Sequence, residues 1–596
     1  MTSRSGNAVL RADRVEWAEE TTLGPELVLV EKEREKERRQ DRAAQAEQLV
    51  KVLVLAGYAA VVALGIAWHE PWADEGQAWL LARDQGFWHL MLHSLRYEGS
   101  PGLWHALLWV LVRGHVGYAG MHWVSGAVAV GGIYVFLRLS PFPLILNILL
   151  PFGFWLAYQD AVVARSYVLY AILAFTAAAI LRGMIPEYEP ADRGRLICLG
   201  VLLGLMANLS VHGFVASVGF AVVALAALRR KARAGFPVRK AMAAVLLCCF
   251  WLLAVVTAFP PSDIDYILDR NPQHTAEKIW ARLGNQDAKK QLAAKEGTDV
   301  RPGELTPLPP LELHHTARER NWRKAARLLA TLTFPVSNFR YLALGCVVLA
   351  MAMAIVFSRR RGGLGWVGLM PWVLMVVLFR MIDNGPRHAG MLWESLLAGL
   401  WLTWPLHAPR GAQLWLQRVT LAVLVLVALD QAWWTAHAVW GDVHGPYSGD
   451  VEMAKFLRSQ GPDKKIAGFS YHSVGTAALF DHRIYFNQPT AYWIWSRNVR
   501  INQEAQQTIA RHPDIIDVGG YELSERNGTI TDDWIRPDPR ELHEAPLNEV
   551  FGIIPWAEAH GYRETHRFCG HAFMRDGYSE LECQVALQPV QSAGRQ

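Results

Sequence analysis

Apolar segments long enough to cross a lipid bilayer recur between Val50 and Trp434, and this recurrence constrains the fold more than any other feature. A helix needs about 20 residues to cross roughly 30 Å of hydrocarbon, and it satisfies its own backbone polar groups there. The sequence is 52% hydrophobic and holds 25 Trp and 22 Phe, which suits long membrane interfaces. The pattern predicts a mainly α, polytopic membrane protein and excludes an ordinary soluble enzyme.

Basic residues predict which way the segments run, because cytoplasmic loops carry an excess of Lys and Arg. Residues 1–50 are strongly charged and should stay in the cytoplasm, and the alternating charges of 31–39 are typical of a solvated helical face or a flexible tail. The segment 102–112 is short for a span, so we expect it at the interface. Most basic clusters then fall inside, which predicts about eleven spans and a C-terminus outside. The expected spans are 52–68, 119–137, 142–157, 166–181, 196–211, 214–228, 241–258, 340–357, 364–379, 389–406 and 414–434.

Three parts follow from these spans: a charged cytoplasmic segment 1–50, a transmembrane domain 51–434 with outer loops at 69–118 and 260–326, and an extracytoplasmic domain 435–596. In the last part, β-like runs and helical patterns alternate, which indicates a small α/β or α+β domain. The β-like runs are 465–470, 483–487 and 514–518, and the helical patterns are 451–459 and 502–511.

Cysteine spacing and charge pattern exclude two classes of site. No set of Cys and His has the spacing of a structural zinc site. No basic stripe is interleaved with aromatic residues, so we expect no nucleic-acid partner. Cys569 and Cys583 lie in the hydrophilic C-terminal part and are candidates for a disulfide, because an exported compartment is oxidising.

Two carboxylates, Asp74 and Glu75, lie a few residues beyond the first span. A carboxylate at this depth is costly to desolvate and normally faces protein, water or an ion. Pro71 ends the preceding helix, and the acidic pair begins the next one, where the helix dipole favours anions. The pair could also be a plain N-terminal helix cap.

Further charged residues lie in other outer turns. Asp160 and Arg165 occupy the second turn, where they could pair with one another or serve a site. A lone interfacial histidine such as His212 is more often structural. A later turn is crowded with charge, and its arginines suit phosphate recognition because the guanidinium fork binds phosphate bidentately. That turn contains Arg380, Asp383, Arg387 and His388.

Carboxylates and cations from separate outer turns suit transfer of a group from a lipid phosphate. A carboxylate would act as general base on an acceptor hydroxyl, or Asp74 and Glu75 would hold a divalent metal ion such as Mg²⁺, Mn²⁺ or Zn²⁺. The cations would neutralise the departing phosphate. No cofactor beyond such an ion is expected.

The same residues, over about positions 50–406, resemble the GT-C superfamily of membrane glycosyltransferases, particularly the protein O-mannosyltransferase and aminoarabinose-transferase-like branch. The motifs that carry the resemblance are Asp74-Glu75, Ser100-Pro101-Gly102, Asp160, Arg165-Ser166-Tyr167 and Arg387-His388. The last motif departs from the usual Arg-Tyr of the family. The resemblance implies transfer of a sugar from a polyprenyl-phosphate carrier to an acceptor outside the cytoplasm.

Roles for single residues follow from that resemblance. Asp74 is expected to be the catalytic base, with Glu75 as its neighbour or a metal ligand, and Asp160 as a secondary carboxylate. The donor phosphate would meet Arg165, Arg387, His388 and Arg380.

The acceptor, a glycan, lipid or protein, is not identified by the sequence, and neither is the sugar. We expect a bacterial inner (plasma) membrane location, although an endoplasmic reticulum membrane fits the sequence as well. Two other classes of function remain open. A polytopic lipid or saccharide transporter or flippase also places charges in membrane helices, but it usually has internal repeats, which this sequence lacks. A membrane-anchored receptor would work through its outer domain alone.

Overall fold

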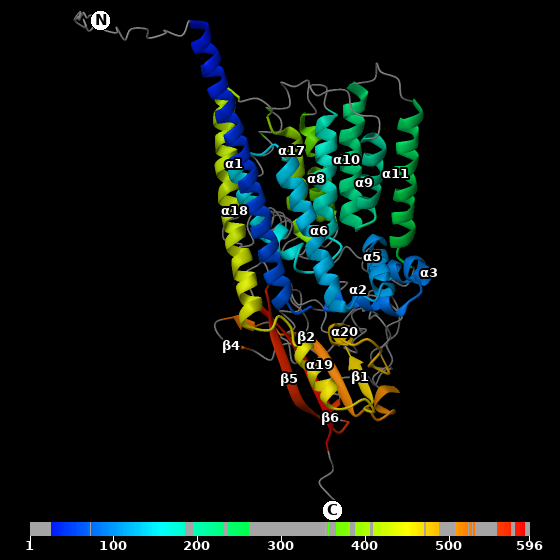
Figure 1. Ribbon diagram of the computed structural model, residues 1–596. Helices are drawn as coiled ribbons and strands as arrows, with labels where there is room; N and C mark the ends of the chain where they lie inside the picture. Colours follow the sequence, from blue (N-terminus) through cyan, green and yellow to red (C-terminus); the bar gives the residue numbers. More distant parts are fainter. Residues whose placement is uncertain are drawn as a thin grey trace, which may run out of the picture. The chain divides into compact units, whose positions relative to one another are not determined.

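The computed structural model consists mainly of long helices, with a small sheet formed by the C-terminal part of the chain (Figure 1). This confirms the expected fold class of a mainly α protein with a small C-terminal domain of mixed helix and strand. The structure describes residues 25–71, 73–184, 195–230, 237–261, 352, 356, 365–381, 388–405, 409–469, 473–487, 507–522, 524–526, 529–530, 557–558, 560–573 and 579–590.

The chain divides into two compact units, Met1–Leu53 and Val54–Gln596, and helix α1 (Pro25–Trp68) begins in the first and ends in the second. Within the first unit, charged side chains of α1 pair along one helix at a spacing of four residues. Glu35 meets Arg39 at 2.6 Å, and Glu47 meets Lys51 at 2.7 Å. Pairs of this kind contribute only a few tenths of a kcal/mol, about 0.3–0.5, and are typical of a solvated helical face.

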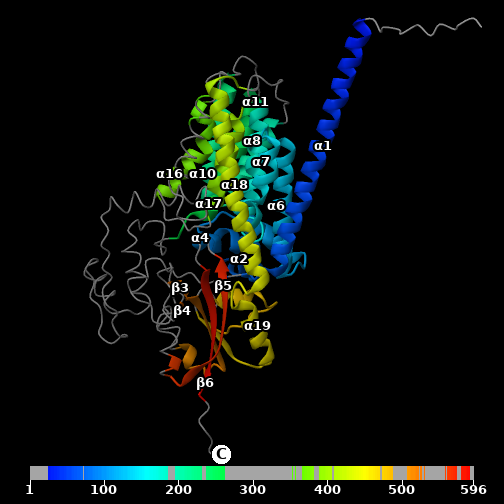
Figure 2. The same cartoon turned by 90° about the vertical axis from the view of Figure 1, so that its left-hand side faces the viewer.

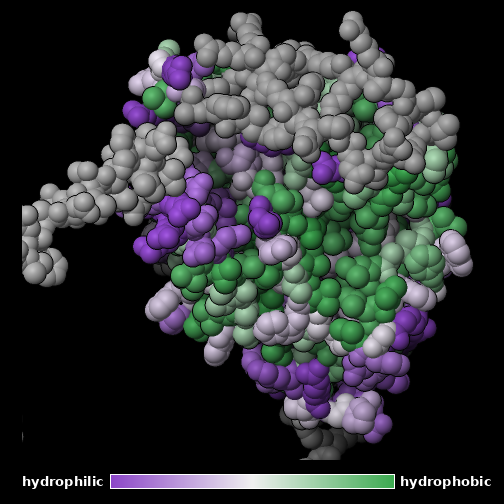
Figure 3. All heavy atoms as spheres, turned by 45° about the horizontal axis from the view of Figure 1, so that its top comes forward, coloured by the Kyte–Doolittle hydropathy of each residue, from purple (hydrophilic) through white to green (hydrophobic). Residues whose placement is uncertain are grey.

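Within the described residues, five helices are long and apolar enough to cross a membrane, as expected of an integral membrane protein. They are α1, α6 (Tyr118–Leu139), α10 (Val211–Arg230), α11 (Pro237–Ala258) and α18 (Ala412–His444). Shorter apolar helices, α8 (Val168–Gly183), α9 (Arg195–Ala207) and α16 (Met370–Met381), pack among them. Hydrophobic side chains cover much of the helical face that Figure 3 shows, and they suit contact with lipid.

Helix α17 (Ala389–Thr403) is buried along its whole length, against α8 and α16. A helix that is apolar and covered on all sides belongs to the interior of the bundle. Residues carried by α17 therefore have no direct access to lipid or bulk water.

The expected span 142–157 is not one regular helix. It consists of α7 (Leu144–Leu149), the 3₁₀ turn η2 (Leu150–Phe152) and the π-helical turn η3 (Trp155–Gln159). Pro151 lies in η2, and a proline has no N–H to continue an α-helical ladder. The π-helical geometry of η3 sets the direction of the turn that follows it, residues 160–167.

Short helices lie between the long helices and the sheet: α2 (Ala73–Asp84), α3 (Phe87–His89), η1 (Leu90–Ser94), α4 (Leu95–Glu98) and α5 (Leu103–Arg113) (Figure 1). Helix α5 has 11 residues, and at 1.5 Å per residue it reaches only about 16 Å. It is too short to span, in agreement with the expected interface helix. The predicted span 340–357 and the loop 260–326 lie almost wholly outside the described residues.

The C-terminal sheet has the strand order β1-β2-β6-β5. Strands β1 (Ile466–Phe469) and β2 (Ile515–Glu522) are parallel, whereas β6 (Ser579–Pro589) runs antiparallel to both β2 and β5 (Tyr562–Phe573). The strands β3 (Ser524–Arg526) and β4 (Thr529–Ile530) form a separate pair. Helix α19 (Asp450–Ser459) packs beside β5 and β6 (Figure 2), and α20 (Ser473–Ala478) packs on α19.

Sequence patterns anticipated β1, β2 and α19, but not the long β5–β6 hairpin. The run 483–487 contributes only an isolated bridge between Tyr485 and Ile466. The helical pattern 502–511 lies mostly outside the described residues. Cys569 and Cys583 are direct cross-strand partners in the hairpin, and a disulfide joins them.

Replacing both cysteines by serine should loosen the sheet. The bridge closes a loop with a sequence separation of 14, and a loop of about 15 residues corresponds to about 3 kcal/mol of unfolded-state entropy. We expect limited proteolysis of the full chain to cut the variant's C-terminal region faster than the wild type's. A Cys198→Ser variant, which alters an unpaired cysteine on α9, should digest like the wild type. Equal rates for the double variant would contradict a stabilising bridge.

Candidate functional site

Asp74 and Glu75 lie in the first turn of α2 and point in different directions, because adjacent helical residues are about 100° apart. The Asp74 side chain is 8% exposed and forms an ion pair with the Arg165 guanidinium, which is 21% exposed. The Glu75 side chain is fully buried. The two acids that the sequence treats as one pair therefore occupy different environments.

Buried donors surround the Glu75 carboxylate. His122 Nε2 lies 3.0 Å from Oε1, and the backbone N–H of Ala164 donates to the same oxygen at 2.6 Å. His69 Nε2 lies 3.5 Å from Oε2. Burial alone would raise the pKa of Glu75, but His122 and His69 hold it below its ordinary value. Glu75 is thus an anion inside the protein, and its bond to Ala164 fixes the turn that carries Arg165.

His69 extends this network to a second carboxylate. Its Nδ1 lies 3.3 Å from Oδ2 of Asp442 on α18, and the Tyr158 hydroxyl donates to the same oxygen at 2.9 Å. Burial would lower the pKa of His69, but Asp442 and Glu75 outweigh it and raise that pKa to about 10. An imidazolium between two carboxylates therefore joins the ends of α1, α2 and α18.

A row of rings continues from Arg165. The Arg165 guanidinium lies 5.6 Å from the centre of the Tyr167 ring, within the range of a cation–π contact. Tyr167 meets His388 edge to face at 5.4 Å, and His388 stacks on His212 at 4.5 Å. Asp74, Arg165, His212 and His388 come from four separate turns, and the structure brings these turns together.

The remaining predicted site residues are placed differently. Asp160 is buried and forms no ion pair with Arg165, so the alternative in which those two neighbours pair is wrong. The reason is local: Arg165 pairs with Asp74, while Asp160 is the C-cap residue of the π-helical turn η3. Arg380 belongs to α16, but its side chain lies outside the described part of the structure, as does Arg387.

Sequence reasoning missed the histidine partners His69, His122 and His105. His105 on α5 is 5% exposed, and burial together with the Arg165 charge lowers its pKa to about 3, so it is a neutral ring beside the arginine. Their positions were the signal that could have found them. His69 directly follows the end of α1, and His105 and His122 lie in the first turns of α5 and α6. A histidine there has a charge state that its neighbours decide.

The C-terminal domain supports α2 directly. Gly76 faces the backbone of α20, where an added Cβ would lie 2.9 Å from Val474 O and 3.0 Å from Gly475 Cα. Only glycine allows so close an approach. Ser448 N lies 3.4 Å from a carboxylate oxygen of Glu70, just before α2. The helix that carries Asp74 is therefore held between the bundle and the C-terminal domain.

Asp74 and Glu75 do not fit the divalent metal ion that the sequence allowed for them. The Asp74 carboxylate is engaged by a guanidinium, and Glu75 accepts from the Ala164 amide and lies against the rings of His122 and His69. Within the described residues, no group of three or more His, Cys, Asp or Glu side chains is placed to hold a metal ion.

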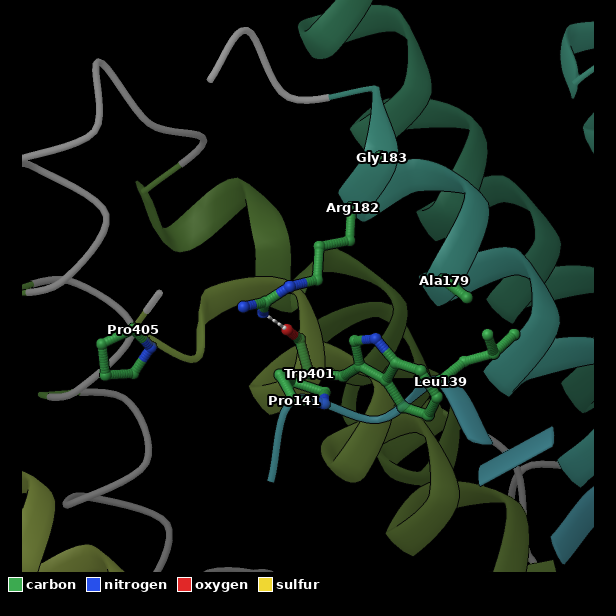
Figure 4. A pocket seen from close by; sticks show the side chains of 7 residues that line it. All are labelled: Leu139, Pro141, Ala179, Arg182, Gly183, Trp401 and Pro405. Atoms are coloured by element: carbon green, nitrogen blue, oxygen red, sulfur yellow. Dashed lines mark hydrogen bonds between the residues drawn. The ribbon is translucent and has the colours of Figure 1, made fainter. Parts of the chain in front are cut away.

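A pocket of about 410 Å³ lies away from these residues, between the ends of α6, α8 and α17 (Figure 4). Its lining residues are Leu139, Pro141, Ala179, Arg182, Gly183, Trp401 and Pro405. Inside it Arg182 donates to the carbonyl oxygen of Trp401. His122 and Leu139 lie at opposite ends of α6, about 25 Å apart at 1.5 Å per residue, so this pocket is remote from Glu75.

No protein-family model matches the chain, and no curated protein matches it. Among the solved structures that are similar to it are two of ArnT from Cupriavidus metallidurans. The crystal structure of ArnT from Cupriavidus metallidurans in the apo state has 10% identity and a TM-score of 0.46, covering 78% of this chain and 92% of that chain. ArnT from Cupriavidus metallidurans bound to undecaprenyl phosphate has 12% identity and a TM-score of 0.46, covering 91% and 99%.

Protonation of His69 should make the stability of the protein depend on pH. A pKa raised to about 10 in the fold, against an ordinary 6.5, means that the stabilisation is complete below pH 6.5 and is lost as the pH rises toward 10. We expect the thermal unfolding midpoint of the purified protein to fall across this range. The matched His69→Gln variant should lose most of that dependence, and an unchanged profile in the variant would rule out His69 as its source.

Removing the Glu75 carboxylate should destabilise the whole bundle. Truncating one partner of a buried ion pair costs about 3–5 kcal/mol, because the opposite charge stays buried without compensation. We expect Glu75→Ala to lower the thermal midpoint in detergent well below that of the wild type. The control Glu452→Ala breaks an exposed pair with Lys455 and should leave the thermal midpoint close to that of the wild type. If both variants melt alike, the buried Glu75 carboxylate does not hold the helix ends together.

Proposed function

We propose that this protein is a glycosyltransferase that moves a sugar from a polyprenyl-phosphate carrier to an acceptor on the outer side of the membrane. The observation that carries the proposal is the ion pair between Asp74 and Arg165. It joins a carboxylate able to accept a proton to a guanidinium able to bind a phosphate, on two different turns. Both groups are partly exposed, whereas Glu75 is buried behind them.

The division of roles follows from the environments of the two acids. Asp74 would take the proton of the acceptor hydroxyl as its oxygen attacks the anomeric carbon. The bond from that carbon to the phosphate oxygen breaks, and the polyprenyl phosphate leaves with the bonding electron pair. Arg165 would stabilise the charge of the departing phosphate, with His388 close by through Tyr167. Attack opposite to the leaving group gives inversion at the anomeric carbon.

Glu75 has a different part in this proposal. Its carboxylate is fully engaged by His122, His69 and Ala164 N, so it positions the turn of Arg165 and does not react. Arg380 and Arg387 remain further candidates for the phosphate, on the strength of the sequence alone.

Membrane orientation belongs to the same proposal. We place residues 1–50 in the cytoplasm and the domain 435–596 outside a bacterial inner membrane, with 51–434 between them. The disulfide between Cys569 and Cys583 supports this, because such bonds persist in oxidising compartments. The charged face of α1 around Glu35 and Arg39 suits the cytoplasmic side.

Asp74→Asn is the decisive change. It keeps the size of the side chain but removes the base, so transfer of labelled sugar from a polyprenyl phosphate should fall by about 100-fold or more. The assay measures label reaching extracytoplasmic acceptors in proteoliposomes. The matched control is Asp84→Asn on the same helix, where Asp84 pairs with Arg83, and it should retain wild-type transfer.

Two results would overturn the proposal. Wild-type transfer by the Asp74→Asn variant would remove Asp74 as the base. Movement of intact lipid-linked sugar across the membrane, without transfer to any acceptor, would favour a transporter or flippase instead.

A further inference from the structure

A buried acid of the C-terminal sheet, Asp517, takes no part in the candidate site. It lies on β2 and is fully buried, and among the described residues its Oδ1 has no hydrogen-bond partner. The ion pairs that the structure describes in this domain, such as Lys464 with Asp514, do not include it. A carboxylate ion that is buried without a cation is costly, so the charge state of Asp517 requires an explanation.

One phenol oxygen contacts both Asp517 and helix α20. Tyr485 Oη lies 2.5 Å from Asp517 Oδ2 and 3.2 Å from the carbonyl oxygen of Ser473, the first residue of α20. A phenol has a single hydrogen to donate, and a carbonyl oxygen can only accept. If Tyr485 donates to Ser473, the hydrogen between Tyr485 and Asp517 must come from Asp517. Both bonds therefore form together only when Asp517 is a neutral carboxylic acid.

A second buried acid, Asp450, lies near this chain of bonds. It is the first residue of α19, and its Oδ1 accepts from Thr476 Oγ1 at 2.9 Å and from Gln584 Nε2 at 2.7 Å. Two donors favour the ionised form of Asp450, and its negative charge disfavours a second one at Asp517. Burial raises the pKa of Asp517 from 3.8 to about 8; the Tyr485 bond opposes this shift and the Asp450 charge adds to it.

The other described elements packed against β2 bring no further charge to Asp517. Strand β1 and helix α20 carry no titratable side chain. On β6, the neutral Gln584 pairs with Gly519, two residues along β2, and so lies on the same face of the sheet as Asp517. Asp450 and Tyr485 are thus the titratable groups that face Asp517 among the described residues.

Helix α20, which Tyr485 contacts, also supports α2. An added Cβ at Gly76 of α2 would lie 2.9 Å from the carbonyl oxygen of Val474, the residue after Ser473. The bond from Tyr485 to Ser473 therefore acts one residue away from the close contact with the helix that carries Asp74. A chain of bonds runs from the sheet, through Tyr485, to the helix on which α2 packs.

We propose that Asp517 is a proton-dependent positioning residue, which holds α20 against α2 through Tyr485 when it carries a proton and releases α20 when it does not. On deprotonation the proton passes to the solvent, Tyr485 turns its own hydrogen to the new carboxylate, and the bond to Ser473 breaks. The support of α2, and with it the position of Asp74, then weakens. This inference concerns α20 and α2, and it stands whether or not the proposed glycosyl transfer is correct.

The direction of the pH dependence follows from the shift. An unfolded chain ionises Asp517 near its ordinary pKa of 3.8, whereas the folded protein keeps the proton until about pH 8. The stabilisation that the protonated acid gives the fold is therefore complete below the ordinary pKa and is lost as the pH rises through about 8. The bond to α20 opens at the upper end of this range.

Infrared difference spectroscopy tests for the proton directly, because a neutral carboxylic acid has a carbonyl band that a carboxylate lacks. The full-length wild type and Asp517→Asn are compared in detergent at about pH 6.5, below the raised pKa. The wild type should show one protonated carboxyl more than the variant. The control Asp463→Asn changes an exposed acid of the same domain and should give the wild-type band.

Hydrogen exchange tests the release of α20. Rates are normalised to the intrinsic exchange rate at each pH, and peptides covering α20 and α2 are followed. From about pH 6.5 to about pH 9.5, protection should fall about fivefold to tenfold in the wild type and in Asp463→Asn, as expected for the loss of one hydrogen bond. Asp517→Asn should stay protected at both values, because its amide N–H donates to Tyr485 in place of the acid proton. Tyr485→Phe should be poorly protected at both.

Three results would overturn the proposal. The first is an infrared spectrum in which Asp517→Asn loses no protonated carboxyl. The second is wild-type protection of α20 that does not change with pH, and the third is protection that falls equally in Asp517→Asn. The comparison of the wild type with Asp517→Asn decides the matter even where Tyr485→Phe fails to fold.

Discussion

Burial of one carboxylate, that of Glu75, organises the helix ends around the candidate site. A charge with no access to solvent must be balanced within the protein. Glu75 contacts His122 of α6, His69 at the end of α1 and the backbone amide of Ala164. His69 in turn holds Asp442 of α18. Three partners thus converge on the Glu75 side chain, and Asp442 joins the network through His69.

The consequence for chemistry is a separation of tasks between neighbouring acids. Glu75 supplies rigidity, because its lone pairs are occupied by fixed donors. Asp74, one residue earlier and about 100° around the helix, keeps a partly exposed position against a long arginine side chain. In the proposed function, Arg165 would bind the phosphate, and a preorganised carboxylate beside such a cation lowers a transfer barrier electrostatically. In the proposed function, the fixed Glu75 would hold the helix turn that carries the reactive Asp74 in one position.

Much of the architecture could be predicted from local pattern, since hydropathy and basic loops report directly on membrane insertion. The acids at 74, 75 and 160 could be found in the same way. Their partners could not: His69 and Asp442 are 373 positions apart, and no local signal links them. Asp160 and Arg165 are close in sequence, yet the π-helical turn before them sends them to different neighbours. The sequence pattern did not predict the β5–β6 hairpin, because charged residues such as Arg563 and Glu564 interrupt the alternation of polar and apolar residues along β5.

The contact between Gly76 and the backbone of α20 has a consequence for dissecting this protein by truncation. One face of helix α2 packs on the bundle and the other on the C-terminal domain. At Gly76 the contact with Val474 and Gly475 leaves no room for a Cβ atom. Cutting the chain near Gly441 would therefore remove a wall of the candidate site as well as a domain. An inactive truncated protein could not be taken as proof that the C-terminal domain recognises a ligand of its own. The helical bundle and the C-terminal domain both hold α2 in place, so point substitutions are needed to separate their contributions.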